Sequence, residues 1–182
     1  MLFKREVRIL GLSASVDKAH TGIIIGVVFR GNLWLDGMIT CKLESNQADY
    51  LSQLSREITD SKQYSQLRVV ILSKQFNTQL KKIDIAALAN SIKLPVISIV
   101  QRKRGRLASK TVKGRESKEG GLHKFRAHGG PVFVRIAGID VNRALQVFEV
   151  GRMEPHRVPE AARVADLIAK RAHIATYESQ IK

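Results

Sequence analysis

The segment from Thr21 to Leu43, TGIIIGVVFRGNLWLDGMITCKL, limits the possible folds more than any other part of the chain. It is rich in β-branched and aromatic residues, which favour strands, and it is interrupted by the turn-forming pair Gly31-Asn32. We therefore expect two long strands joined as a hairpin. The apolar run from Arg8 to Leu12 ends at the small residues 13–15, which predicts a further strand before the hairpin.

The middle of the chain alternates between helical and strand-like patterns. Leucines and isoleucines at helical spacing predict a helix over 46–62, with Asn46 as its N-cap. The stretch LRVVIL, residues 67–72, is an unbroken apolar run typical of a strand covered on both faces, so we expect it at the centre of the sheet. Asp84 suits the N-cap of a second helix, and the stretch PVISIV, residues 95–100, then predicts another strand.

The C-terminal part predicts one more strand and two helices. The stretch PVFVRIAGI, residues 131–139, is expected to form the last strand, followed by a helix from Val141 to about Val150. A final helix is expected from Pro159 to about Tyr177, because proline fits the first turn of a helix. Its inward-facing residues are expected to be Val164, Leu167 and Ile168.

This order of elements predicts an α/β protein in which a mixed sheet is flanked by helices. It is compatible with a ribonuclease-H-like architecture, although the pattern alone does not choose that fold over other α/β sandwiches. A chain of 182 residues is long enough for one core and short for two, so we expect a single domain over residues 1–182.

Positive charge is concentrated in one segment. The chain has 31 lysines and arginines against 16 aspartates and glutamates, a net charge of +15, which favours a polyanionic partner such as nucleic acid. Residues 102–128 combine many cations and glycines with little apolar spacing, and we expect a mobile basic arm or extended loop that contacts the phosphate backbone. Phe125 is the only aromatic residue in this arm, so base stacking has less support than backbone contact. The predicted nucleic-acid-binding residues are Arg102, Lys103, Arg104, Arg106, Lys110, Lys113, Arg115, Lys118, Lys124 and Arg126.

Other classes of protein find no support in the sequence. No apolar run approaches the ~20 residues that span a bilayer, and the N-terminus lacks the pattern of a secretion signal, so a cytoplasmic location is expected. Cys41 is the only cysteine, which excludes an internal disulfide and a thiolate zinc cage. The five histidines match no metal-ligand spacing, and nothing in the sequence places one of them beside a serine as a general base.

Several stretches carry a resemblance to a known family. They are RILG, GVVFRGNLWLDGMIT, LRVVIL, IDIAALANSIKLPVISIVQRK and VPEAARVADLIA. In these stretches the chain resembles the archaeal endonuclease V-like family associated with deoxyuridine endonuclease activity, also called domain of unknown function ninety-nine. The resemblance implies a ribonuclease-H-like fold in which acidic side chains at strand ends hold a divalent cation that activates water against a phosphodiester.

The chain departs from that family where the cation would bind. After RILG the family continues with an isoleucine and a pair of aspartates, whereas this chain has Leu12, Ser13 and Ala14. After VVIL the family has an aspartate before a glycine, whereas this chain has Ser73 before Lys74. Two of the three principal acidic positions are therefore lost. Because Mg²⁺ depends on carboxylate ligands, we expect no metal site at these positions.

Some acids remain for a rearranged site. The family's Asp-Gly-x-Asp motif is replaced here by a stretch that begins with Glu44, and a histidine of the family pattern is replaced by Asp166. The residues that could be catalytic in an active enzyme are Glu44, Asp36, Asp84, Glu160 and Asp166. Structural interpretations compete for four of them. Asp36 suits a turn before a glycine, Asp84 a helix cap, Glu160 the first turn of a helix and Asp166 a surface charge.

The sequence leaves several functions open. The leading hypothesis is a non-catalytic nucleic-acid-binding protein that needs no cofactor. An RNA-binding component of a ribonucleoprotein such as the ribosome is a second version of it. The enzymatic alternative is an endonuclease dependent on Mg²⁺ or Mn²⁺ that acts at deoxyuridine or another damaged base, with its acids centred on Glu44. A last possibility is a protein that pairs with an active homologue and recruits DNA to it.

Overall fold

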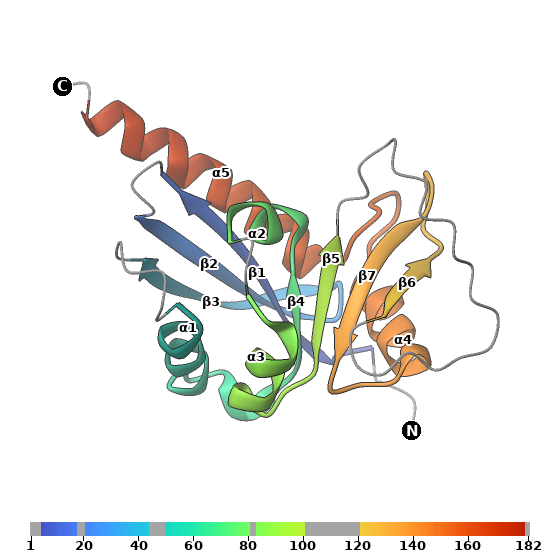
Figure 1. Cartoon of the computed structure of the whole chain (residues 1–182). Coiled ribbons are helices and arrows are strands. Elements are labelled where there is room, and N and C mark those ends of the chain that lie inside the picture. The colour runs from blue at the N-terminus through green and yellow to red at the C-terminus, as the bar shows by residue number, and fades with distance from the viewer. Residues whose placement is uncertain (1–4, 18–20, 44–49, 81–82, 101–120, 181–182) are drawn as a thin grey trace.

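The computed structural model describes residues 5–17, 21–43, 50–80, 83–100 and 121–180. Within them seven strands form one sheet in the order β3-β2-β1-β4-β5-β7-β6 (Figure 1). β1, β4 and β5 run parallel to one another, and the remaining neighbours pair antiparallel. The strands are β1 (Arg8–Val16), β2 (Gly22–Arg30), β3 (Trp34–Leu43), β4 (Leu67–Leu72), β5 (Val96–Val100), β6 (Leu122–Phe125) and β7 (Val132–Ala137).

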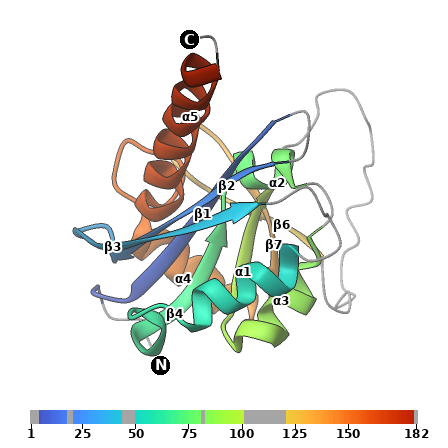
Figure 2. The ribbon, with the colours of Figure 1, turned by 90° about the vertical axis from the view of Figure 1, so that its left-hand side faces the viewer.

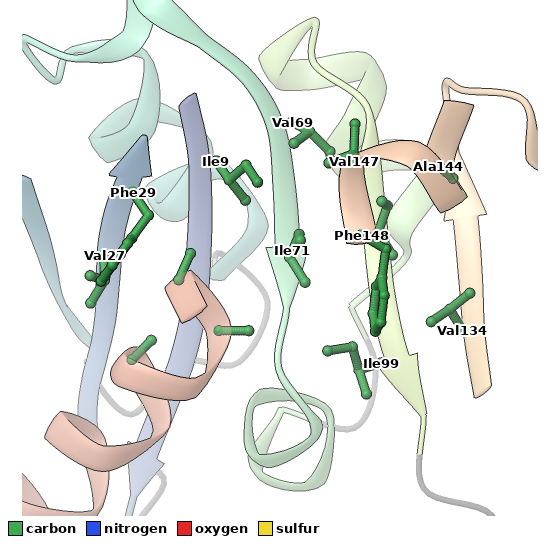
Figure 3. Packing of buried hydrophobic residues seen from close by; sticks show 14 of the residues in the cluster. Ile9, Val27, Phe29, Val69, Ile71, Ile99, Val134, Ala144, Val147 and Phe148 are labelled. Atoms are coloured by element: carbon green, nitrogen blue, oxygen red, sulfur yellow. The ribbon is translucent and has the colours of Figure 1, made fainter. Parts of the chain in front are cut away.

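Helices cover both faces of the sheet (Figures 1 and 2). They are α1 (Tyr50–Thr59), α2 (Lys74–Gln79), α3 (Ile85–Ile92), α4 (Val141–Gly151) and α5 (Glu160–Gln180), with a short 3₁₀ helix at Tyr64–Gln66. One core layer joins α4 and α5 to the sheet, and Figure 3 shows Phe148 of α4 beside Ile99 of β5. The other core layer joins α1, α2 and α3 to the opposite face. No helix in the described ranges is long and apolar enough to cross a membrane.

Most predicted elements are present. The three opening strands form, the turn between β2 and β3 begins at Gly31 with a positive φ of 59°, and β4 is the central strand of seven. The Asp84 side chain accepts hydrogen bonds from the backbone N–H groups of Ala86 and Ala87, which confirms it as the N-cap of α3. The expected helix over 46–62 is described as α1, which ends at Thr59, and Asn46 lies outside the described residues.

Two predictions are wrong in part. The segment over residues 102–128 is not an arm throughout, because 122–125 form β6 against β7 and Phe125 is buried, edge-to-face on Phe148 at a centroid distance of 5.4 Å. Alternation in this edge strand turns Phe125 inward while Lys124 stays exposed. In α5, Val164 and Ile168 pack partly buried against the core, as expected, but Leu167 is 51% exposed. The fully buried apolar residues of this helix are alanines, namely Ala161, Ala162, Ala165 and Ala169.

Small residues let α5 lie very close to the sheet. The helix packs on β1 and β2, and its first turn crosses β1 at Gly11. A Cβ at Gly11 would overlap backbone atoms of Ala161 and Ala162, so glycine is required there to admit the helix. This close approach fixes α5 over β1, next to the candidate site.

Candidate functional site

The centre of the site is the point where β4 ends beside β1, which itself continues to Val16; we call this point the strand ends. β1 and β4 are neighbours with Leu12 opposite Leu72, and the backbone N–H of Ser73 donates to the carbonyl of Leu12 at 2.9 Å. Ser13 therefore lies next to Ser73 at the same edge of the sheet. Both side chains are buried, with exposed fractions of 0% and 1%. Positions 13 and 73 are two of the three at which the family that this chain resembles has acids. The third, Ala14, is buried in the core layer on the opposite face of the sheet.

Each serine hydroxyl has a defined partner. Ser13 Oγ donates to Asp166 Oδ1 of α5 at 2.6 Å, across 153 residues of sequence. Ser73 Oγ accepts from the backbone N–H of Phe76 at 3.0 Å and so caps α2. Asp166 is partly buried at this contact, so its interpretation as a plain surface charge is wrong. The sheet and α5 together assemble a small polar cluster from distant parts of the chain.

Two adjoining hollows open beside this cluster, with volumes of about 480 Å³ and about 610 Å³. Lys74 and Asp166 line both hollows, and we call the two together the Lys74 cleft. The first continues past Arg157 to an apolar wall that includes Ile99 and Val158. The second lies between α2 and α5 and is lined by residues with polar side chains, whose carbon atoms form most of its wall. Besides the two shared residues they are Ser15, Gln75, Thr78, Gln79 and Lys170.

The charge of the Lys74 cleft is positive. Three cations, Lys74, Arg157 and Lys170, line it against the single carboxylate of Asp166. All three cations are exposed, and Arg157 is oriented by donating from Nη2 to the carbonyl of Pro131 at 2.9 Å. The arrangement attracts anions. It has the room and the mixed polar and apolar walls that a phosphate with an attached organic group would need.

The side chains of the cleft do not fit a divalent cation. Mg²⁺ takes carboxylate and other hard oxygen ligands in near-octahedral geometry. Here the strand ends offer two hydroxyls that already hold hydrogen bonds, one carboxylate and an adjacent lysine. Across the described ranges, no group of three or more histidine, cysteine, aspartate or glutamate side chains is placed to hold a metal. Glu44 lies outside these ranges.

Asp36 belongs to a separate ion-pair cluster. It accepts from Arg8 Nε at 2.5 Å and from Arg30 Nη2 at 2.9 Å, at the end of β1 opposite to Ser13. The hydrogen bond from Arg8, supported by Arg30, lowers the pKa of the Asp36 carboxyl. Asp36 is not a turn residue, because it lies inside β3 where the register with β2 shifts. Its role there is structural.

Two further acids also have structural partners. Asp84 caps α3, as described above. Glu160 is 3% exposed in the first turn of α5 and accepts from Arg163, with the closest contact at 2.6 Å from Nη2. Glu160 is therefore an acid in the first turn of a helix, as predicted. Neither Glu160 nor Asp84 lies at the strand ends.

The predicted basic residues divide into two groups. Lys124 and Arg126 are exposed in and just after β6. The other eight lie outside the described residues, namely Arg102, Lys103, Arg104, Arg106, Lys110, Lys113, Arg115 and Lys118. Val100, the last described residue before them, lines the Lys74 cleft. The chain therefore enters its basic segment directly from the cleft.

Sequence reasoning missed two cations of the cleft. Asp166 and Lys170 are four residues apart in α5 and so share one side of the helix, which is a signal that could have linked Lys170 to the site. Arg157 gives no such signal, because it lies in a connection whose course only the folded chain defines.

Comparison with known proteins gives the chain its family. The family model described as endonuclease dU matches residues 5–173. A UPF0215 protein of Methanopyrus kandleri is 30% identical over 185 residues, covering 91% of each chain. A UPF0215 protein of Methanosarcina acetivorans is 29% identical over 178 residues, covering 91% of this chain and 90% of that one.

Solved structures share the fold. A protein of unknown function from Archaeoglobus fulgidus has a TM-score of 0.66 at 19% identity, covering 91% of this chain and 97% of that one. Human ENDOV has a TM-score of 0.66 at 11% identity, covering 94% and 86%. Endonuclease V of Ciona intestinalis, solved with a 24mer DNA containing an inosine, has a TM-score of 0.65 at 12% identity, covering 97% and 87%. The sheet thus has the ribonuclease-H-like fold of endonuclease V, and the chain belongs to the endonuclease dU family.

Proposed function

We propose that the chain binds nucleic acid without cleaving it, and that the phosphate backbone contacts the Lys74 cleft and the basic segment 102–128. The observation that carries this proposal is that the site has positively charged side chains where the family has acids that would bind a cation. Ser13 and Ser73 stand at the strand ends. Lys74, Arg157 and Lys170 line the cleft beside them. The membership in an endonuclease family and the DNA-bound structure of the Ciona relative support nucleic acid as the ligand class.

A metal-dependent endonuclease is the second candidate, and one observation favours it. The family model described as endonuclease dU matches the chain over residues 5–173. Such an enzyme would need Glu44 together with Asp166 or another acid to hold Mg²⁺ or Mn²⁺. The cytoplasm is the compartment that we propose for either function.

An incision assay separates the two candidates. End-labelled duplex DNA with one deoxyuridine is incubated with the full chain and Mg²⁺ or Mn²⁺, and is resolved on a denaturing gel beside an active family member. We expect no incision at protein concentrations that saturate the DNA, because the strand ends carry hydroxyls where carboxylates are needed. Incision that disappears in Glu44→Gln would instead establish a rebuilt metal site and overturn the proposal.

The basic segment should dominate the salt dependence of binding. If the chain neutralises about six phosphates of a duplex, log K falls with log salt at a slope near −5. Replacing Arg102, Lys103, Arg104 and Arg106 together by alanine should flatten this slope by about 3 to 4, because each lost phosphate contact removes about 0.9. Fluorescence anisotropy over a series of salt concentrations measures both slopes.

The control for this quadruple variant is its own thermal melting curve, which should match that of the wild type. An unchanged salt slope would remove the segment from the binding surface. Competition at matched salt between duplex DNA and structured RNA then identifies the preferred ligand, since the 2′-hydroxyl and the A-form groove distinguish the two.

A further inference from the structure

Lys74 lies at the end of β4, beside the two serines that stand where the family has acids. It directly follows Ser73 at the end of β4, beside Leu12 and Ser13 of β1, and its exposed side chain lines both hollows. Within the described part of the chain Lys74 takes part in no ion pair. Its ammonium group is therefore available to an anionic ligand from outside the protein.

The neighbouring carboxylate leaves Lys74 available. Asp166 accepts the hydroxyl hydrogen of Ser13 at 2.6 Å, so one of its oxygens is directed to the sheet. Lys170 lines the same hollow one helical turn further along α5, and Arg157 lines the other hollow. Three cations against one carboxylate leave the cleft positive even with Asp166 ionised. A phosphodiester, with a single negative charge, would be attracted rather than repelled.

The apolar wall strengthens this attraction. Ile99, Val132 and Val158 line the first hollow beside Lys74, and Ala162 of α5 lies with them. A ligand that fills this hollow removes water from one side of the ammonium group, which lowers the effective dielectric constant between the charges. The same wall offers contact area to a sugar or base attached to the phosphate.

We infer that Lys74 takes over the electrostatic role of a divalent cation and holds a backbone phosphodiester directly, so that nucleic-acid binding at this cleft is independent of divalent metal. The inference rests on the proposed function and adds to it the residue and the ion dependence of the site. The Lys74 ammonium donates to a non-bridging phosphate oxygen, while Arg157 and Lys170 attract the phosphates on either side.

The test measures the affinity of the full chain for a labelled DNA duplex by fluorescence anisotropy, in EDTA and in Mg²⁺ at matched ionic strength. The wild type should bind in both buffers and no more tightly in Mg²⁺ than in EDTA, because Mg²⁺ itself competes for the phosphates. Lys74→Met keeps the length of the side chain and removes its charge. It should raise Kd by about tenfold in either buffer and reduce the salt slope by about 1.

Lys62→Met is the matched control. Lys62 is also exposed, but it lies between α1 and the 3₁₀ helix, before β4 begins and thus at the opposite edge of the sheet. Its substitution removes the same charge and should leave Kd close to the wild-type value. Thermal melting checks that both variants are folded, and Lys74→Gln repeats the measurement with a polar neutral side chain.

Three results would overturn the inference, and they differ in whether the proposed function fails with it. If Lys74→Met binds like Lys62→Met while the wild type binds well, the inference fails and the proposed function stands. If the wild type binds only with Mg²⁺ or Mn²⁺, a metal rather than Lys74 contacts the phosphate. If the wild type binds neither DNA nor RNA in either buffer, the proposed function fails as well.

Discussion

Gly11→Ala should lower the free energy of unfolding by about 3 kcal/mol or more. The added Cβ would overlap backbone atoms of Ala161 and Ala162, in the first turn of α5. A side chain can rotate away from such an overlap, but the backbone of a helix cannot. The helix must therefore move off the sheet, and the buried alanine face of α5 loses its contacts with β1.

Gly26→Ala is the control for this prediction. Gly26 lies in β2 opposite Leu12, and a Cβ there would meet the ends of the Leu10 and Leu12 side chains at 3.1 Å and Cβ of Ile39 at 3.3 Å, but no backbone atom. Those side chains can shift by a few tenths of an ångström, so a much smaller loss is expected. Urea unfolding followed by circular dichroism compares the two variants. Equal losses would show that α5 does not depend on the close approach at Gly11.

Gly11 also affects the site, because α5 carries the only carboxylate that the structure places in the Lys74 cleft. A displaced α5 would break the hydrogen bond that Ser13 Oγ donates to Asp166 Oδ1 at 2.6 Å. The position of α5 therefore determines both the packing of its alanines on β1 and the placement of Asp166 in the Lys74 cleft.

The features that could be predicted from the sequence are those set by neighbouring residues. The β2–β3 turn at Gly31 and the cap of α3 at Asp84 depend on residues within a few positions, and both form as expected. The central strand β4 was also predictable, because an unbroken apolar run requires cover on both faces.

The features that could not be predicted depend on contacts between distant segments. An apolar leucine in a helix is normally directed inward, yet Leu167 is exposed, and the fully buried apolar residues of α5 are alanines where the helix approaches β1 closely. The same holds for the pair Ser13 and Asp166, which comes together only through the packing of α5. Loss of the family's acids was visible in the sequence, whereas the cluster of cations around Lys74 required the fold.

Ser13→Asp returns an acid to one of the positions where the family has one, and it should also lower the free energy of unfolding strongly. Ser13 is fully buried and donates to Asp166, so an aspartate there would place a second carboxylate against the first. Without divalent metal we expect the free energy of unfolding at neutral pH to fall by about 3 kcal/mol. Mutual repulsion raises the pKa of one carboxyl in the folded state above its unfolded value. The loss should therefore shrink as the pH falls through that raised pKa.

Ser13→Asn is the matched control, because asparagine has nearly the shape of aspartate and keeps an N–H donor for Asp166. It should lose less stability, and its loss should not depend on pH in this range. Adding Mn²⁺ should raise the melting temperature of Ser13→Asp, since two adjacent carboxylates attract a cation that the unfolded chain does not bind. The wild type and Ser13→Asn should not respond. A wild-type protein stabilised by Mn²⁺ would mean that the present residues already hold a metal, and Lys74 could then not be the cation that meets the phosphate.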